Sequence, residues 1–191
     1  TSEPSLHPSP KVDPPLDGDL PPFPIVNTNS LELVGYVDAA HGNDLRSRCS
    51  TTGYGFMLVG GCVSYRCKTQ TTTATSSTEA KFYAAVTAAK QAKYLCAVLI
   101  ELGFPQPTPT KLYCDNQSAI KMVNAQIPTE RLRHICIQWF AIQDWKSQGH
   151  IVLDYIMGIM NPADDLTKPL GWVLHSCHTR RLMGHYSNIR A

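Results

Sequence analysis

No stretch of this 191-residue sequence approaches the roughly 20 consecutive apolar residues that a membrane-spanning helix needs. A strong charge of one sign is also lacking, because the formal net charge is only +2. Any contact with a nucleic acid would therefore use a local basic patch. With 43% hydrophobic and 17% charged residues, the composition is typical of a soluble globular protein that does not contact a membrane.

Paired cysteine motifs are absent as well. The seven cysteines are odd in number, show no CxxC pair and lie mostly inside apolar segments. This pattern favours reduced thiols in an intracellular protein over a disulfide framework. Thr1 is not followed by a charged and then apolar signal stretch, so we expect a piece of a longer chain that is not secreted.

Proline is concentrated at one end of the chain. Residues 1–30 hold more than half of the 14 prolines and almost no apolar periodicity, so we expect an extended, disordered linker there. Residues 31–170 are expected to form one domain, because the chain is long enough for a single ordinary core plus tails. Residues 171–191 are interpreted as a basic, histidine-bearing C-terminal tail.

Hydrophobic periodicity predicts an α/β fold. Apolar residues recur every three or four positions along one long helix, and Gly60-Gly61 is a connection typical of a tight hairpin. The order βββαβααβα indicates a mixed sheet with helices packed on its faces. In chain order, the predicted elements are strands at 31–39, 53–59 and 62–68, a helix at 76–102, a strand at 110–114, helices at 117–124 and 130–147, a strand at 150–157 and a short helix near 162–167.

Four carboxylates stand at the ends of these elements. Asp38 and Asp115 each end an apolar strand, and if the two strands are adjacent and parallel, both side chains project at one edge of the sheet. Glu79 and Asp164 stand at the beginnings of two helices. Four carboxylates placed in this way would hold two divalent cations about 4 Å apart, the spacing that serves in-line phosphodiester cleavage.

Each of these acids also has a purely structural interpretation. Ser76 and Glu79 match a capping box, and Asp164 would complement the dipole of a helix start. Asp38 and Asp115 are ordinary turn residues for the end of a strand. Local sequence alone does not decide between the two interpretations.

Taken together, the motifs resemble the ribonuclease H domain of copia-type LTR retrotransposon Pol polyproteins, from about Val34 to Gly184. The resemblance implies the ribonuclease H-like fold, with five strands in the mixed order 3-2-1-4-5 and helices on both faces. The motifs that carry it, in order, are GYVDAAHGND at Gly35, TSSTEAKFYAA at Thr75, LYCDNQSAIKM at Leu112, ERLRHICIQWF at Glu130 and NPADDLTKPL at Asn161.

By this resemblance, Asp38, Glu79, Asp115 and Asp164 are the catalytic residues and the ligands of two Mg²⁺ ions, for which Mn²⁺ is a substitute. The implied activity is metal-dependent endonucleolytic cleavage of the RNA strand of an RNA·DNA hybrid during reverse transcription. The implied partners are the hybrid and the reverse transcriptase portion of the same polyprotein. We expect the isolated domain to be a monomer and the protein to reside in cytoplasmic virus-like particles or the nucleus.

The match also has departures, which motivate an alternative function. Tyr65 stands where a tryptophan is usual, and Lys81 stands where the SSTEA motif normally continues with a second glutamate. Cys136, Gln138 and Phe140 replace residues that are often acidic, acidic and histidine. The alternative is a catalytically weak or inactive, diverged domain that binds nucleic acid or a protein partner.

Substrate-binding residues are expected beside the acids. Asn116 and Ser118 follow Asp115 and would hydrogen-bond to substrate, with a helix N-cap as the alternative. Lys168 is interpreted as a surface lysine near a helix end, with a contact to a phosphate as the alternative. Basic residues in polar turns and at a helix start would contact phosphates without reading the base sequence, unless they form merely solvated loops: Arg46, Arg48, Arg131, Arg133 and His134.

Overall fold

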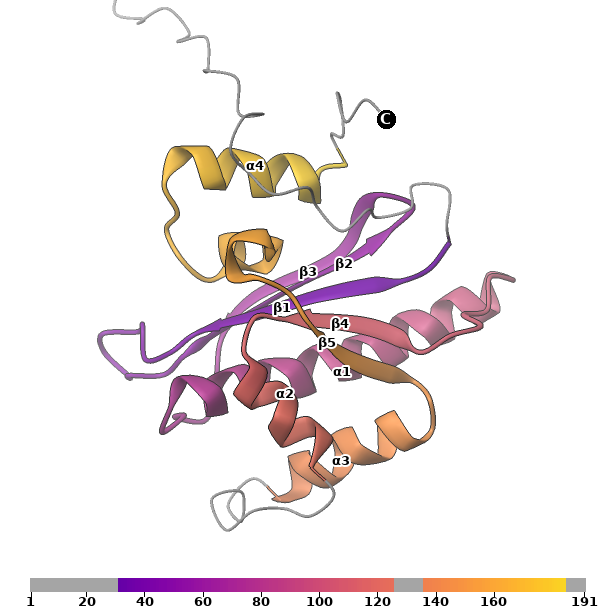
Figure 1. Cartoon of the computed structure of the whole chain (residues 1–191), viewed down its shortest axis with the longest axis horizontal. Helices are drawn as coiled ribbons and strands as arrows, with labels where there is room; N and C mark the ends of the chain where they lie inside the picture. The colour runs from indigo at the N-terminus through magenta and orange to yellow at the C-terminus, as the bar shows by residue number, and fades with distance from the viewer. Residues whose placement is uncertain (1–30, 126–135, 185–191) are drawn as a thin grey trace, which may run out of the picture.

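A five-stranded mixed sheet in the order β3-β2-β1-β4-β5 forms the centre of the molecule (Figure 1). The computed structural model describes residues 31–125 and 136–184. The predicted strand order is confirmed, and helices cover both faces of the sheet. The predictions made for residues 1–30 and for residues 130–134 fall outside the described ranges.

The first three strands form the predicted antiparallel meander. They are β1 (Val34–Ala40), β2 (Thr51–Leu58) and β3 (Gly61–Thr69). Val59 and Gly60 connect the last two strands with φ angles of 50° and 80°. Positive φ at both positions is the geometry of a tight two-residue hairpin. The turn therefore lies one residue earlier than the predicted Gly60-Gly61 connection.

Two parallel strands extend the sheet on the other side of β1. Strand β4 (Thr110–Cys114) pairs with β1, and β5 (Ile151–Tyr155) pairs with β4. The last pair between β1 and β4 joins Val37 to Cys114. The expected adjacency of the two aspartate-bearing strands is therefore confirmed, and the residue after each member of this pair is an aspartate.

Helix α1 (Ser77–Glu101) crosses one face of the sheet. Small side chains on its inner face, among them Ala84, Ala88 and Ala92, are completely buried and let the helix lie close to the strands. Ser76 is its N-cap and accepts a hydrogen bond from the backbone N–H of Glu79, and Leu102 is its C-cap. The predicted bounds of this helix therefore coincide with its two caps.

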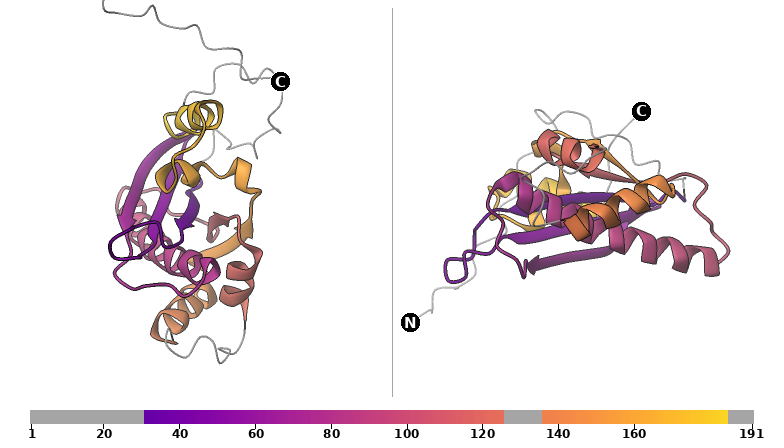
Figure 2. Two further views of the ribbon diagram at one scale, coloured as in Figure 1. Left: turned by 90° about the vertical axis from the view of Figure 1, so that its left-hand side faces the viewer. Right: turned by 90° about the horizontal axis from the view of Figure 1, so that it is seen from below.

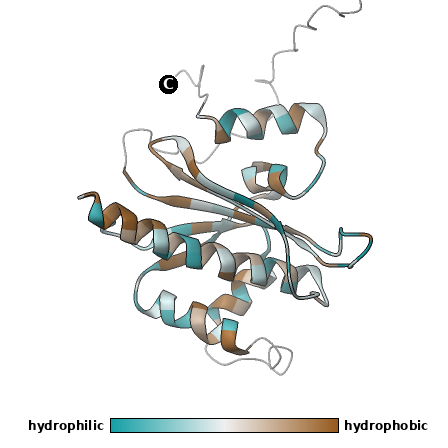
Figure 3. Ribbon diagram, turned by 180° about the vertical axis from the view of Figure 1, so that it is seen from behind, coloured by the Kyte–Doolittle hydropathy of each residue, from teal (hydrophilic) through white to brown (hydrophobic). Residues whose placement is uncertain are grey.

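Two shorter helices share this face and complete the larger core. They are α2 (Gln117–Asn124) and α3, described from Cys136 to Ser147. Phe82, Leu112 and Ile142 are among the completely buried side chains that join α1, β4 and α3. Figure 3 shows apolar positions continuing to the carboxyl end of α1, where Leu102 is exposed. No helix in the described ranges is both long and apolar enough to cross a membrane.

The opposite face carries a smaller layer, which Figures 1 and 2 show on the far side of the sheet from α1. It consists of the short 3-10 helices η2 (Gly158–Met160) and η3 (Pro162–Leu166), followed by helix α4 (Trp172–Leu182). Tyr36 and Met160 are buried in the small core beneath them. Helix α4 lies in the segment that was interpreted as a basic tail, and it packs on η3 and β3.

Candidate functional site

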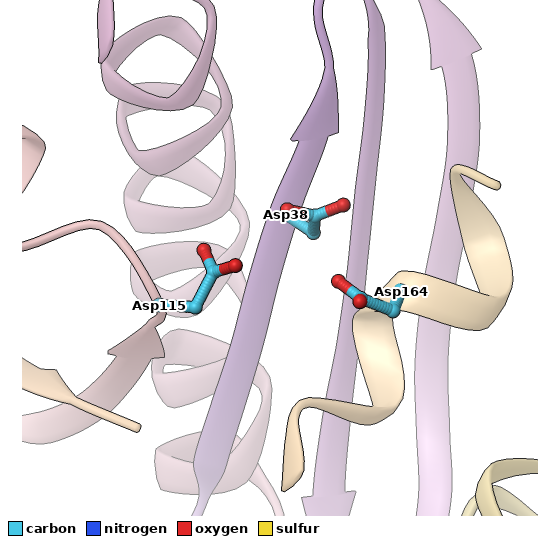
Figure 4. Close-up of side chains that lie close together, drawn as sticks. All are labelled: Asp38, Asp115 and Asp164. Carbon is cyan, nitrogen blue, oxygen red and sulfur yellow. The ribbon is translucent and has the colours of Figure 1, made fainter. Parts of the chain in front are cut away.

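Three aspartates meet where β1 and β4 separate (Figure 4). Asp38 lies on β1, Asp115 follows β4, and Asp164 lies on η3. One carboxylate oxygen of each residue lies within 4.8 Å of the others. Asp38 is completely buried, and Asp164 is 8% exposed. Three of the four predicted acids are therefore brought together at the predicted edge of the sheet.

Side-chain hydrogen bonds at both ends of helix η3 hold it against β1. The Nδ2 group of Asn161 donates to the backbone carbonyl of Val37 at 3.0 Å, and its Oδ1 accepts from the N–H of Ala163 at 3.2 Å. The hydroxyl of Thr167 donates to Oδ2 of Asp38. These contacts fix Asp164, at the middle of η3, beside the carboxylate of Asp38.

Glu79 occupies a different place. Its carboxylate accepts hydrogen bonds from the backbone N–H of Thr75 at 2.8 Å, from the Thr75 hydroxyl at 2.5 Å and from the hydroxyl of Tyr83 at 2.8 Å. The side chain is buried, but it is not part of the group of three aspartates. Ser76 thus caps α1 as in the predicted capping box, whereas the Glu79 carboxylate accepts from the N–H of Thr75, one residue before the cap. The role of Glu79 as a metal ligand stays a prediction.

Two lysines lie among the aspartates instead. The Nζ atom of Lys81 lies 2.8 Å from Oδ1 of Asp38 and also donates to Oδ1 of Asp115. The Nζ atom of Lys168 lies 3.0 Å from Oδ1 of Asp164 and 3.3 Å from Oδ2 of Asp38. Three carboxylates and two ammonium groups leave the site with a formal charge of −1. The surface interpretation of Lys168 is therefore corrected, because its ammonium group belongs to the site.

The ionisation of these groups follows from burial and from each other's charge. Burial alone would raise the pKa of Asp38, but the Lys81 ammonium, aided by Thr167 and Lys168, outweighs it and lowers this pKa. Burial likewise opposes the charge on Lys81, but Asp38 and Asp115 raise its pKa overall. Burial, reinforced by the charge of Asp38, raises the pKa of Asp164 to about 6 against the pull of Lys168. Asp38 and Lys81 are consequently a charged pair at neutral pH.

The donor chemistry of the three aspartates suits a hard divalent cation, whose preferred ligands are carboxylate oxygens. The approach between Asp38 and Asp115, however, is taken by the Lys81 ammonium. The ammonium lies 2.8 Å from Oδ1 of Asp38, so both its charge and hydrogen bonding hold it at this carboxylate. With Lys81 in this position, the residues do not fit the expected pair of Mg²⁺ ions.

The predicted substrate-binding residues are placed in three ways. Asn116 is the N-cap of α2, because its Oδ1 accepts from the N–H of Ala119 at 2.8 Å, while Ser118 is exposed in the first turn of α2. Arg46 and Arg48 are exposed in the turn that follows β1. The other three predicted residues lie outside the described ranges: Arg131, Arg133 and His134.

Sequence reasoning missed three members of the site. Lys168 lies four residues after Asp164, the spacing of one helical turn, and its contact was therefore detectable. Thr167 stands beside it in the same motif. The signal for Lys81 was that it stands where the motif usually has a second glutamate. Glu79, two residues earlier, matched the motif and was therefore assigned the role of metal ligand.

A separate pocket of about 210 Å³ lies between the β2–β3 hairpin and α1. Its lining includes Arg66 and Lys68 from β3 and Tyr83 from α1, together with several threonine side chains. None of the three aspartates lines it. Two basic side chains and several hydroxyl groups therefore gather in a pocket on the α1 side of β3, apart from the aspartates.

Comparison with known proteins gives the relationships of the chain. No protein-family model matches the sequence. It is 37% identical over 136 residues to the retrovirus-related Pol polyprotein from transposon TNT 1-94 of Nicotiana tabacum, covering 71% of this chain and 10% of that protein. The chain belongs to the retrovirus-related Pol family. A second member, from transposon RE2 of Arabidopsis thaliana, is 29% identical over 154 residues, covering 81% of this chain and 11% of that protein. The chain thus spans about a tenth of the length of these curated relatives.

Solved structures identify the fold of this Pol segment. LC11-RNase H1, isolated from compost, matches with a TM-score of 0.55 and 13% identity, covering 72% of this chain and 94% of that one. The same protein in complex with an RNA/DNA hybrid matches with a TM-score of 0.53 and 13% identity, covering 71% and 94%. At this identity the likeness concerns the fold alone. The predicted ribonuclease H-like fold is confirmed.

Proposed function

We propose that this chain is a ribonuclease H-type domain of a copia-type Pol polyprotein and that it binds RNA·DNA hybrids at the edge carrying Asp38, Asp115 and Asp164. The observation that carries this proposal is the meeting of these three carboxylates at one edge of a ribonuclease H fold. The substrate class is supported by LC11-RNase H1, which shares the fold and has been crystallised with an RNA/DNA hybrid.

Contacts with the phosphates would come from basic side chains around this edge. Arg46 and Arg48 are exposed in the turn after β1, and Arg66 and Lys68 line the pocket beside α1. Such contacts set the register of a nucleic acid without reading its sequence. Discrimination of RNA from DNA requires a contact with the 2′-hydroxyl, and the exposed hydroxyl of Ser118, three residues after Asp115, is our candidate for it.

We propose further that the wild-type chain cleaves hybrids slowly. The carboxylates that would organise the reaction are paired with lysines, and Lys81 lies between two of them. This assignment follows the alternative of a diverged, catalytically weak or inactive domain, which the substitutions in the sequence suggested.

A second candidate function is metal-dependent endonucleolytic cleavage of the RNA strand during reverse transcription, beside the reverse transcriptase portion of the polyprotein. The meeting of Asp38, Asp115 and Asp164 favours it, because their oxygen atoms suit Mg²⁺ or Mn²⁺. It requires the ammonium group of Lys81 to leave its place between Asp38 and Asp115.

The two candidates are separated by measuring binding and cleavage on the same samples. RNA·DNA hybrid, duplex DNA and duplex RNA of equal length are titrated with the full chain, with Mg²⁺ and with EDTA. We expect preferential binding of hybrid in both buffers and little cleavage. Equal affinity for hybrid and duplex DNA would remove the proposed function. Rapid Mg²⁺-dependent cleavage that Asp115→Asn abolishes would establish the second candidate.

A pair of matched variants locates the binding face. Replacing Arg46 and Arg48 together by Ala should weaken hybrid binding and reduce the slope of log affinity against log salt by about 2, one for each lost phosphate contact. Lys111 is the control, because it is exposed at the opposite end of strand β4 from Asp115. Lys111→Ala should leave the salt slope unchanged.

A further inference from the structure

Helix α1 contributes a lysine to the acidic site, whereas β1, the end of β4 and η3 each contribute an aspartate. We propose that the Lys81 ammonium is a built-in counter-ion that replaces a divalent cation between Asp38 and Asp115, and that residue 81 decides whether the site binds metal. This inference rests on the proposed function only for the location of the site. Its test measures cation binding, which needs no nucleic acid.

The phase of α1 shows why position 81 and not position 79 reaches the site. Residues two apart on an α-helix point about 200° apart around its axis. Glu79 is held at the start of the helix by Thr75 and by Tyr83, one turn further along. Lys81 consequently points away from that cluster, and its ammonium reaches both Asp38 and Asp115. Lys81 is therefore the α1 residue whose charged group lies between Asp38 and Asp115.

Lys81 is a mostly buried counter-ion for two carboxylates. Its side chain is only 11% exposed, and its two partners come from different strands that no longer pair with each other at this point. Without a cation between them, two carboxylates at the end of parallel strands repel each other. The Lys81 ammonium supplies the positive charge between the two carboxylates. A divalent cation entering this gap would be repelled by the ammonium at contact distance.

Lys168, the second lysine of the site, is more exposed than Lys81. The side chain of Lys168 is 37% exposed and lies on the other side of Asp38, beside Asp164. Its movement toward solvent would open one side of the site but would leave Lys81 in place. Substitution of Lys81 by glutamate would change the site to four carboxylates and one ammonium, with a formal charge of −3.

The experiment compares cation binding by the wild-type full chain and by Lys81→Glu. Mn²⁺ and Mg²⁺ are added alone, and binding is followed by calorimetry and by the rise in Tm that accompanies binding to the native state. We expect no response from the wild type and a rise in Tm for Lys81→Glu, with a Kd for Mn²⁺ at least about tenfold lower. Adding Asp115→Asn to Lys81→Glu should remove the response.

A matched change two residues away tests the assignment of the position. Glu79→Gln keeps the size of the side chain and is placed in both the wild-type and the Lys81→Glu backgrounds. We expect it to leave the Mn²⁺ response of Lys81→Glu intact, because Glu79 is not part of the aspartate group. Loss of that response would assign the metal-binding position of α1 to residue 79 and overturn the inference.

Two further outcomes decide the inference. Equal Mn²⁺ affinity of the wild type and Lys81→Glu would overturn it, as would a folded Lys81→Glu without a Mn²⁺ response. If Lys81→Glu does not fold without metal, Lys81→Gln removes the ammonium without adding a charge and should still bind Mn²⁺ more tightly than the wild type. Hybrid affinity of the wild type in EDTA is measured separately, so a failure of the proposed function is seen independently of the metal result.

Discussion

The Nζ atom of Lys81 lies 2.8 Å from Oδ1 of Asp38, a carboxylate that is completely buried at the end of a central strand. A buried carboxylate is stable only with compensating charge and hydrogen bonds. For Asp38 these come from Lys81 on α1 and from Thr167 and Lys168 at the end of η3. The acidic site therefore joins the two helical layers through the sheet, and its charge balance bears on folding as well as on function.

Loss of the Lys81 charge should destabilise the protein strongly. Lys81→Met keeps an unbranched side chain but leaves Asp38 and Asp115 without their shared counter-ion. Breaking a buried ion pair in this way costs about 3–5 kcal/mol of the free energy of unfolding. Lys90→Met is the matched control, because Lys90 is exposed on the same helix and its replacement should change stability by less than about 0.5 kcal/mol. Urea unfolding of both variants measures the difference, and similar values would show that Lys81 is not a buried partner.

Close packing of η3 over β2 depends on Gly53. This residue pairs with Asp38, and a Cβ atom added to it would lie 2.5 Å from Cγ2 of Thr167 and 2.9 Å from Cβ of Leu166. Gly53→Ala should therefore push η3 away from the sheet and cost about 1–3 kcal/mol. Gly61→Ala is the control, because no atom lies within 4 Å of its added Cβ. Equal stability of the two variants in urea would contradict the close approach.

The hydroxyl of Thr167 should matter more than its methyl group. Thr167→Val keeps the shape but removes the donor to the buried Asp38, so we expect a loss of about 1–3 kcal/mol. Thr179 also donates its hydroxyl to a carboxylate, that of Asp165, but Thr179 itself is exposed and Asp165 has a second partner in His175. Thr179→Val should therefore change stability by less than about 0.5 kcal/mol. Thermal unfolding of both variants is the measurement, and a larger effect at Thr179 would refute the role assigned to Asp38.

Local sequence was sufficient for the elements whose causes are local. The bounds of β4 and α2 match their prediction, and α1 matches to within one residue at each end, because alanine periodicity, the Ser76 cap and Gly103 all lie within the segment. The pairing of β1 with β4 has no local cause. It joins residues separated by the whole of α1, and the sequence supplied it only through the resemblance to ribonuclease H domains.

The content of the acidic site was less predictable for a related reason. Glu79 and Lys81 stand on one helix, and which of them contacts the aspartates depends on how α1 is rotated against the sheet. That rotation is set by the packing of residues such as Ala84 and Phe82 on the strands. Helix α4 was missed because its sequence carries little apolar periodicity, and its stability comes from docking on η3 and β3.

The docking of α4 should make the protein sensitive to mild acid through His178. This side chain is completely buried, and neither ring nitrogen has a hydrogen-bond partner among the described residues. Burial, reinforced by the charge of Arg181, lowers the pKa of His178 to about 4, against about 6.5 for a histidine in the unfolded chain. Below pH 6.5 the unfolded chain therefore binds a proton that the native state does not.

Above pH 6.5 His178 is neutral in both states and does not change the free energy of unfolding. As the pH falls from 6.5 toward 4, protonation of the unfolded chain lowers this free energy by roughly 3 kcal/mol. Asp164 acts in the opposite sense, because its raised pKa lets the native state bind a proton first. Urea unfolding of the wild type and of His178→Leu across pH 4–7 separates the two contributions, since both proteins share every other titrating group. The wild type should lose more stability than the variant over this range, and parallel curves would show that α4 does not hold His178 in its neutral form.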